Sequence, residues 1–312
     1  MNSIMTNASA MTALQTLNMT NKALETTQSR ISTGYAVSSA SDNAAYWSIA
    51  TTMRSDNKSL SSVQDALGLG AAKADIAQTA IESSIDVVSE MKAKLVAARE
   101  PGVDRTKIQG EIKALQNQLK STASAASFSG ENWVSVDSSA AGYNATKSIV
   151  ASFTGGATVT IGTIDVNVTS TKLFDATAVA GDKGILDKTR TVGVAGPSQF
   201  AGSIATLDIS TLTNSADDLK KLENMITATN TGISEMTDGA SVLGSANKRI
   251  DMQQDFVSNL MDAIDRGIGQ LVDADMTKES SRLKALQTQQ QLGIQSLSIA
   301  NSSSQNLLSL FR

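Results

Sequence analysis

Proline occurs only twice in this chain, at Pro101 and Pro197. The first 100 residues and the last 115 therefore lack the residue that most strongly interrupts an α-helix, which permits very long helices. Within both stretches apolar residues recur at seven-residue spacing, as Ala10, Leu17, Leu24 and Ile31 (with Leu14 beside them) and as Ile250, Val257, Ile264 and Leu271. This recurrence predicts coiled-coil seams near both ends of the chain.

After Leu271 the spacing of the apolar residues changes. Leu286, Leu297 and Leu308 lie eleven positions apart, as do Ala300 and Phe311. An eleven-residue repeat keeps one row of side chains facing the same way on a nearly straight helix. We therefore expect a straight C-terminal helix with one continuous apolar row.

Charged residues are scarce at both ends of the chain. Residues 1–53 hold only Lys22, Glu25, Arg30 and Asp42, and residues 285–312 hold only Arg312. One interpretation pairs the two ends with each other inside a monomeric bundle. A second interpretation also buries the remaining faces of these two ends against copies of the same chain. The scarcity of charge favours this second interpretation, because the solvent-facing side of a helix in a monomer is normally charged.

More conventional helices are expected between the ends. Apolar residues at helical spacing predict helices over residues 43–98 and 105–120, where charged residues are frequent. Ser41 or Asp42 is the expected N-cap of the first of these helices. A returning helix is expected to begin near Ser215, where the sequence "SADD" resembles a capping box.

The middle of the chain, about residues 129–212, is rich in Gly, Thr and Val. The stretch "SIVASFTGGATVTI" predicts a hairpin that turns at Gly155-Gly156, and Ile164, Val166 and Val168 alternate as in a half-buried strand. The expected fold is therefore mainly α. Long N- and C-terminal helices pair into a coiled-coil-like bundle, and a small β-rich domain is inserted in the middle.

The composition argues against several kinds of site. The chain has no Cys and no His, which excludes thiol nucleophiles, disulfides, Cys/His zinc sites and Ser-His or Cys-His pairs. Asp273, Asp275 and Glu279 resemble part of a calcium loop, but Lys278 and Lys284 stand where the loop needs Gly and Glu. We predict a protein that is not an enzyme and has no cofactor or metal.

The charge and hydropathy patterns also limit the partners. The net charge of −4, without a basic block, gives no indication of nucleic-acid binding. No stretch approaches the roughly 20 apolar residues of a membrane span. The N-terminus shows no apolar run of signal-peptide length, which by ordinary secretion rules predicts a cytoplasmic protein.

Three of the five Tyr and Trp residues fall within thirteen positions, at Tyr35, Tyr46 and Trp47. Their neighbours are mostly Ser and Ala, with few charges. Large amphipathic rings in such a segment indicate a contact surface. Packing inside one subunit's bundle and packing against a neighbouring subunit both remain open.

The order of helices and β insert, together with motifs at both ends, resembles the bacterial flagellins. The N-terminal motifs are "TNASAMTALQTLNMTNKALETTQSRISTG", "ASDNAA", "DRTKIQGEIKALQNQL" and "SFSGENW". The C-terminal motifs are "LGSANKRI", "VDADMTKES" and "SIANSSSQNLLSLFR". The chain departs from the family where Tyr46 and Trp47 replace the usual Gly-Leu and Asn43 replaces the second Asp of the "ASDNAA" run.

This resemblance implies a structural subunit that polymerises into the extracellular flagellar filament used for swimming. It implies export through the flagellar type III route with an uncleaved N-terminal signal, which accounts for the missing signal peptide. The implied partners are other copies of the chain, sister flagellins, an export chaperone on the C-terminal helix, and the filament cap and hook-junction proteins. A hook–filament junction protein or another type III-exported structural protein is the alternative, and a secreted coiled-coil adhesin or translocator ranks third.

The resemblance also implies how the chain divides between the layers of a filament. The expected parts are an N-terminal inner helix (1–40), a helical outer-wall segment (41–128), a surface-exposed β-rich domain (129–212), a returning outer-wall helix (213–270) and a C-terminal inner helix (271–312). The residues expected at subunit interfaces are Leu14, Leu17, Leu24, Ile31, Tyr35, Tyr46, Trp47, Ile264, Leu271, Leu286, Leu297, Leu308 and Phe311.

Overall fold

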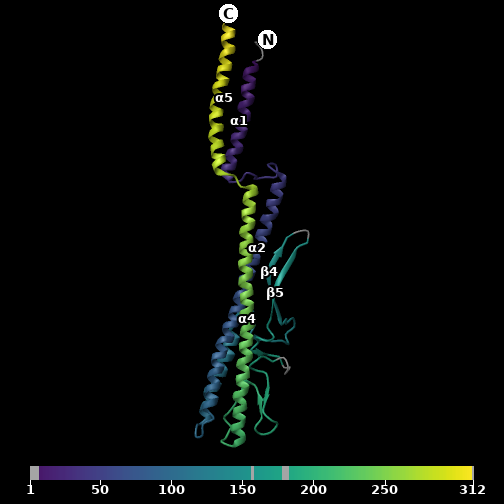
Figure 1. Ribbon diagram of the computed structural model, residues 1–312, viewed down its shortest axis with the longest axis vertical. Helices are drawn as coiled ribbons and strands as arrows, with labels where there is room; N and C mark the ends of the chain where they lie inside the picture. The colour runs from purple at the N-terminus through teal and green to yellow at the C-terminus, as the bar shows by residue number, and fades with distance from the viewer. Residues whose placement is uncertain (1–6, 156–157, 178–182, 311–312) are drawn as a thin grey trace. The chain divides into compact units, whose positions relative to one another are not determined.

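A computed structural model describes residues 7–155, 158–177 and 183–310, with the side chains of 303–310 left undescribed. The helices of this part of the chain are α1 (Ala8–Thr33), α2 (Ala44–Ala97), α3 (Arg105–Ala125), α4 (Ala216–Val272) and α5 (Met276–Leu310) (Figure 1). The mainly helical fold with long terminal helices is thus confirmed. None of the helices in the described ranges combines the length and the apolarity needed to cross a membrane.

The chain divides into two compact units. The terminal unit contains the residues up to Lys58 and those from Met261 onward, and the central unit contains Ser59–Leu260. In the terminal unit α1 and α5 lie side by side in opposite directions (Figure 1). A small apolar core of Ala50, Ile268 and Val272 joins the start of α2 to the end of α4 in this unit.

The central unit has a core of its own. Its helical segments provide large side chains that are fully buried, namely Leu67, Ile81, Met91, Leu95, Ile112, Leu119 and Leu222. Side-chain pairs connect α2 to α4 in antiparallel order, because Asn247 donates to Gln78 at 3.1 Å and Lys92 donates to Asn230 at 2.7 Å. The apolar stripes predicted on these helical segments are therefore buried within the central unit.

Four two-stranded sheets lie in the described part of the middle segment. Two of them are antiparallel hairpins of short strands, β1 (Ser127–Phe128) with β2 (Glu131–Asn132) and β7 (Arg190–Val192) with β8 (Phe200–Gly202). In a third sheet, β3 (Ser135–Val136) pairs in parallel with β6 (Phe174–Asp175).

The longest sheet is the predicted hairpin. Strand β4 (Thr146–Thr154) pairs antiparallel with β5 (Thr160–Asn167), with an irregularity between Val150 and Ser152. The predicted alternation is confirmed, since Ile164, Val166 and Val168 are all buried. Gly155 follows the end of β4, whereas Gly156 of the predicted turn lies outside the described residues.

Two buried arginines join the loops to the helices. Arg105, at the start of α3, donates to Ala98 O at 2.9 Å, to Leu212 O at 3.1 Å and to Asn214 Oδ1 at 2.7 Å. Arg190, on β7, forms a bidentate ion pair with Glu235 of α4 at 2.6 and 3.0 Å. Because each planar guanidinium satisfies several acceptors at once, each one fixes a loop at a defined place on the bundle.

The predicted N-cap of α2 was wrong by one or two residues. Asn43, and neither Ser41 nor Asp42, accepts hydrogen bonds from the backbone N–H groups of Ala45 and Tyr46. The carboxylate of Asp42 instead accepts from the Ser39 and Ser38 backbone and hydroxyl groups, and these hydrogen bonds lower the pKa of Asp42. Asp42 therefore closes the preceding turn, which leaves the capping position to its neighbour.

The predicted start of the returning helix is confirmed. The Ser215 hydroxyl accepts a hydrogen bond from the Asp218 N–H at 3.1 Å, and α4 begins at the next residue, Ala216. The Asp218 carboxylate accepts from the backbone N–H and the hydroxyl of Thr213. It therefore holds the incoming loop rather than completing a reciprocal capping box.

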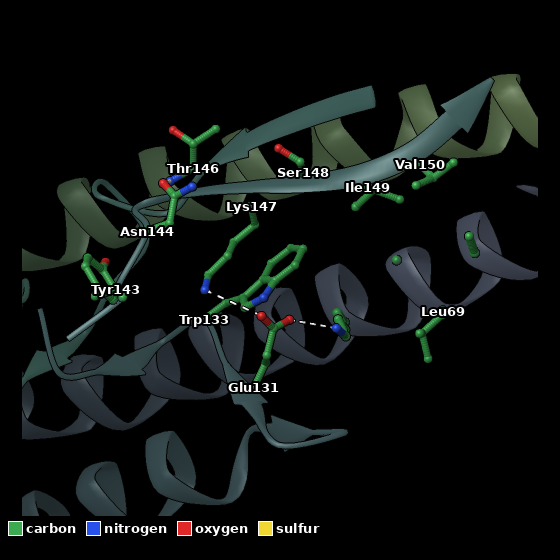
Figure 2. A pocket seen from close by; sticks show the side chains of 14 residues that line it. Leu69, Glu131, Trp133, Tyr143, Asn144, Thr146, Lys147, Ser148, Ile149 and Val150 are labelled. Atoms are coloured by element: carbon green, nitrogen blue, oxygen red, sulfur yellow. Dashed lines mark hydrogen bonds and ion pairs between the residues drawn. The ribbon is translucent and has the colours of Figure 1, made fainter. Parts of the chain in front are cut away.

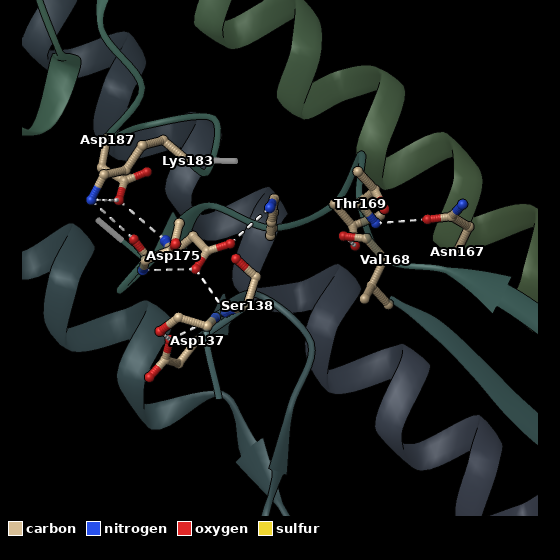
Figure 3. Close-up of polar contacts among 12 residues, drawn as sticks. Asp137, Ser138, Asn167, Val168, Thr169, Asp175, Lys183 and Asp187 are labelled. Carbon is tan, nitrogen blue, oxygen red and sulfur yellow. Dashed lines mark hydrogen bonds and ion pairs between the residues drawn. The ribbon is translucent and has the colours of Figure 1, made fainter. Parts of the chain in front are cut away.

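A buried ion pair stabilises the parallel strands β3 and β6. Lys172 Nζ donates to Asp175 Oδ2 at 2.7 Å, and Asp175 Oδ1 accepts from the N–H groups of Ser138 and Thr177 (Figure 3). Burial opposes ionisation of Asp175, but these hydrogen bonds outweigh it and lower its pKa from 3.8 to about 2. Ionised Asp175 therefore stabilises the folded chain.

Replacing Asp175 with Asn should destabilise the central unit in a pH-dependent manner. The carboxyl has a lower pKa in the folded state than in the unfolded state, so its stabilisation is complete above about pH 4 and declines as the pH falls toward 2. The loss should be about 2 kcal/mol at pH 5 and should shrink between pH 4 and pH 2, as measured by urea unfolding. Asp238→Asn, at an exposed position of α4, is the matched control. A loss that does not change with pH would contradict this account.

Two glycines of α2 allow a matched test of how β4 packs on this helix. A Cβ on Gly70 would collide with the side chain of buried Ile149 on β4, whereas a Cβ on Gly68 would meet nothing within 4 Å. Gly68→Ala should raise the free energy of unfolding by up to about 1 kcal/mol, because alanine favours the helix. Gly70→Ala should lower it by about 1–3 kcal/mol through overpacking. Equal effects in thermal melts would show that β4 does not lie against α2.

Candidate assembly interface

The inner face of α1 follows a regular seven-residue repeat. Buried or half-buried positions alternate in steps of three and four, at Ala10, Ala13, Leu17, Thr20, Leu24, Thr27 and Ile31, and Ala23 and Arg30 beside this row are also half-buried. Alternating steps of three and four are the geometry of a coiled-coil seam. Leu17, Leu24 and Ile31 are therefore half-buried within the chain itself, on the side of the helix that pairs with α5.

The inner face of α5 follows the same repeat, which corrects the expected eleven-residue period. Its least exposed positions are Glu279, Leu283, Leu286, Gln290, Gly293, Leu297 and Ala300. Leu286 and Leu297 both belong to this face, because eleven positions equal one heptad plus one step of four. The heptad was not visible as an apolar row because a glutamine and a glycine occupy two of its positions. A Cβ on Gly293 would lie 3.3 Å from Leu17 Cδ1, so glycine permits close approach there.

Polar contacts fix the register of the two antiparallel helices. Asn7 Nδ2 donates to Ala300 O at 3.0 Å, and Gln290 Nε2 donates to Asn21 Oδ1 at 2.8 Å. At the other end Arg30 pairs with buried Glu279 at 3.3 Å. The side chain of Asp275 caps α5, because it accepts from the Thr277 and Lys278 N–H groups. Two of the three acidic residues that resembled a calcium loop, Asp275 and Glu279, thus serve the helix and its pairing.

The outer faces of both helices carry large exposed apolar side chains. Met11, Leu14 and Met19 of α1 are 51–64% exposed, and Leu292, Ile294 and Ile299 of α5 are 54–70% exposed. A groove of about 640 Å³ runs along α1 past Leu14, and another of about 750 Å³ lies between α1 and α5 beside Leu292. No charged residue occurs between residues 285 and 310. These outer faces therefore resemble interface surface more than solvent-facing surface.

The turn after α1 joins the backbone of three segments of the terminal unit. Gly34 adopts the left-handed conformation at φ 77°, which glycine favours, and its N–H donates to Arg30 O at 2.9 Å. The Ala274 N–H donates to Gly34 O, and Val272 O accepts from the N–H groups of Ala36 and Val37. The ends of α1 and α4 and the start of α5 are therefore held together by main-chain hydrogen bonds.

The three clustered aromatic residues all remain partly exposed in the single chain. Tyr35, Tyr46 and Trp47 are 39%, 46% and 37% exposed, and the Arg54 guanidinium lies 4.9 Å from the centroid of the Tyr35 ring. By contrast, Ile264 and Leu271 pack against the small core of Ala50, Ile268 and Val272. The exposed parts of the aromatic rings are available for contact with another molecule.

Two of the predicted interface residues cannot be placed. Leu308 belongs to α5, but its side chain lies outside what the structure describes, and Phe311 lies outside the described residues altogether. Other exposed apolar residues were not predicted, namely Met11, Met19, Leu292, Ile294 and Ile299. They lie off the repeating apolar rows from which the interface was predicted. Large apolar residues outside such a row, in a helix with few charges, are the signal that would have indicated them.

Comparison with known proteins identifies the family. The model of the bacterial flagellin N-terminal helical region matches residues 4–138, and that of the C-terminal helical region matches residues 226–311. The chain is 53% identical to "Flagellin C" of Rhizobium meliloti (strain 1021), with both chains covered completely. It is 45% identical to "Flagellin A" of the same strain and to "Flagellin" of Brucella melitensis biotype 1, again over the whole of each chain. The chain therefore belongs to the bacterial flagellin family.

Proposed function

We infer that this flagellin polymerises through the outer faces of α1 and α5 and through the segment that carries Tyr35, Tyr46 and Trp47. As a member of its family, the protein is a structural subunit of the bacterial flagellar filament. The observation that supports the proposed contact surface is the row of large apolar side chains on the outer faces of both helices, together with the absence of charged residues from α5 after Lys284.

The physical argument concerns what these side chains gain on assembly. An apolar side chain that moves from water into an interface contributes up to about 1.5–3 kcal/mol, and less where it is already half-covered. Leu14, Leu292 and Ile299 are all more than half exposed in the single chain. When such contacts repeat along both helices, their summed free energy offsets the translational and rotational freedom that each subunit loses on association.

The two outer faces differ in sequence and in shape. A contact in which one face of a subunit meets a different face of the next is heterologous, and when it does not close into a ring it produces a helical polymer. We propose that residues 1–40 and 271–312 form the inner layer of this polymer. Residues 41–128 and 213–270 form its outer wall, and the β-rich residues 129–212 face the surrounding medium.

The comparisons favour a filament subunit over a hook–filament junction protein, because flagellins match along the whole chain. Four flagellins, A to D, are named in the one strain Rhizobium meliloti 1021. We propose that this chain assembles with sister flagellins outside the cell. An export chaperone on α5, and the filament cap and hook-junction proteins, complete the proposed set of partners.

Leu14→Asp should abolish filament growth while leaving the single chain folded. Leu14 is 51% exposed on the outer face of α1, so the aspartate is solvated in the monomer, and its free energy of unfolding should change by less than about 0.5 kcal/mol. In the polymer the same charge would be buried without a partner, which costs several kcal/mol in every subunit. Sedimentation of the variant with wild-type seeds measures the effect.

Two further variants control this experiment. Leu14→Met retains an apolar side chain of similar size and should pellet as the wild type does. Leu17→Asp changes the inner seam instead and should reduce the helix content of the monomer, as measured by circular dichroism. Normal pelleting of Leu14→Asp would place this face of α1 outside the subunit contacts.

Trp47 should become buried when the protein polymerises. The chain has only two tryptophans, Trp47 at 37% exposure and Trp133 at 3%, so the difference between the wild type and Trp47→Phe isolates the Trp47 signal. On polymerisation this signal should shift to shorter wavelength and become less accessible to acrylamide. The Trp133 signal that remains in Trp47→Phe should stay constant. An unchanged Trp47 signal in polymers of proven length would exclude Trp47 from the interface.

A further inference from the structure

Two methionines lie on the outer face of α1. Met11 is 64% exposed and Met19 is 57% exposed, and both line the groove of about 640 Å³ that passes Leu14. The leucines of the seam side, Leu17 and Leu24, are half-buried against α5 instead. Met11 and Met19 therefore belong to the surface that is proposed above for subunit contact.

Methionine brings a chemistry to this face that the other apolar residues lack. Peroxides oxidise the thioether to a sulfoxide, which turns a flexible apolar side chain into a polar one that accepts hydrogen bonds. Leucine would supply apolar area of similar size without this reactivity. By contrast, Met91, Met225 and Met236 are buried in the central unit, where the folded chain shields them from an oxidant. Apolar contact alone therefore does not require methionine at the two exposed positions of α1.

The outer face of α5 has no such chemistry. Its exposed apolar side chains are Leu292, Ile294 and Ile299, and residues 277–310 contain no methionine. An oxidant would therefore change the α1 side of the proposed contact and leave the α5 side as it is.

We propose that Met11 and Met19 form an oxidation-sensitive modification site that controls polymerisation, with a hydroperoxide as the oxidant. This inference rests on the proposed contact surface. A lone pair of the thioether sulfur attacks one oxygen of hydrogen peroxide, so that an S–O bond forms and the O–O bond breaks. The proton of the transferred hydroxyl passes to the departing hydroxide, which leaves as water. Each sulfur is oxidised by two electrons, and the peroxide is reduced by the same two.

Oxidation and assembly should oppose each other. In the free subunit the sulfoxide oxygens of Met11 and Met19 are solvated, so the fold of the subunit changes little. In the polymer the same oxygens would be buried in an apolar contact, where an acceptor without a partner is costly. Conversely, burial in the polymer excludes peroxide from both sulfurs. The site is therefore open to oxidation in the free subunit and closed to it after assembly.

Hydrogen peroxide applied to free full-length subunits tests the proposal. After the peroxide is removed, peptide mass spectrometry measures sulfoxide at each methionine, and sedimentation with wild-type seeds measures growth. Oxidation should raise the critical concentration for polymer growth about ten-fold or more, with little change in the circular dichroism of the subunit. Methionine sulfoxide reductases A and B should restore pelleting, because sulfoxide formation is reversible. In preformed polymer Met11 and Met19 should be oxidised several times more slowly than in the free subunit.

Three double variants separate this site from the other methionines. Met11→Leu with Met19→Leu removes both thioethers, so its pelleting with and without peroxide treatment should be the same. Met252→Leu with Met276→Leu removes two thioethers of similar exposure, 55% and 45%, from outside the groove and should remain as sensitive to peroxide as the wild type. Met11→Gln with Met19→Gln imitates the polar product and should fail to pellet without any oxidant.

The results distinguish failure of this proposal from failure of the contact surface. If the polymer protects Met11 and Met19 but their sulfoxides leave pelleting unchanged, the contact surface stands and the oxidation site is wrong. If neither methionine is protected and Leu14→Asp pellets normally, the contact surface is wrong as well. Loss of pelleting in the peroxide-treated Met11→Leu, Met19→Leu variant would place the sensitive residue elsewhere and would also overturn the proposal.

Discussion

The antiparallel pairing of α1 with α5 is the constraint on which the terminal unit depends. Small or polar residues occupy much of its seam, including Ala10, Ala13, Thr20, Thr27 and Gly293. Such residues let two helices approach closely but bury little apolar area. The large apolar side chains are divided between the two sides of the pair, with Leu17, Leu24, Ile31, Leu283, Leu286 and Leu297 in the seam and Met11, Leu14, Met19, Leu292, Ile294 and Ile299 on the outside. A monomeric helical hairpin normally has a polar outer face, so the proposed assembly would complete the apolar burial of these helices.

The central unit buries its apolar side chains within the single chain. Its helices bury leucine, isoleucine and methionine side chains completely. Its charged residues are used locally, as Arg105 binds loop carbonyls, Arg190 pairs with Glu235 and Lys172 pairs with Asp175. A unit with its own hydrophobic core has the usual property of an independently folding domain. The difference in composition between the ends and the centre of the chain therefore corresponds to a difference in what each unit needs for stability.

Much of this organisation could be predicted from the sequence because it depends on periodicity. The long helices, the β4–β5 hairpin and the Ser215 cap each have a local signal in residue type and spacing. The α5 heptad could not be predicted in this way, because Gln290 and Gly293 are placed by the partner helix and not by their own hydrophobicity. The capping role of Asn43 was hidden for a different reason, since any of three adjacent polar residues could have served and the local turn, in which Asp42 accepts from Ser38 and Ser39, selected one.

The ion pairs around Glu131 (Figure 2) had no signal in the sequence, because Lys73 lies on α2 and Lys147 on β4, and no spacing rule links them. These residues are separate from those of the α1–α5 pair. The seam of that pair needs small residues at fixed intervals along whole helices, whereas the ion pairs need only three side chains of the central unit. The sequence of the central unit can therefore vary without changing the contacts between α1 and α5, because the two sets of contacts rest on different residues.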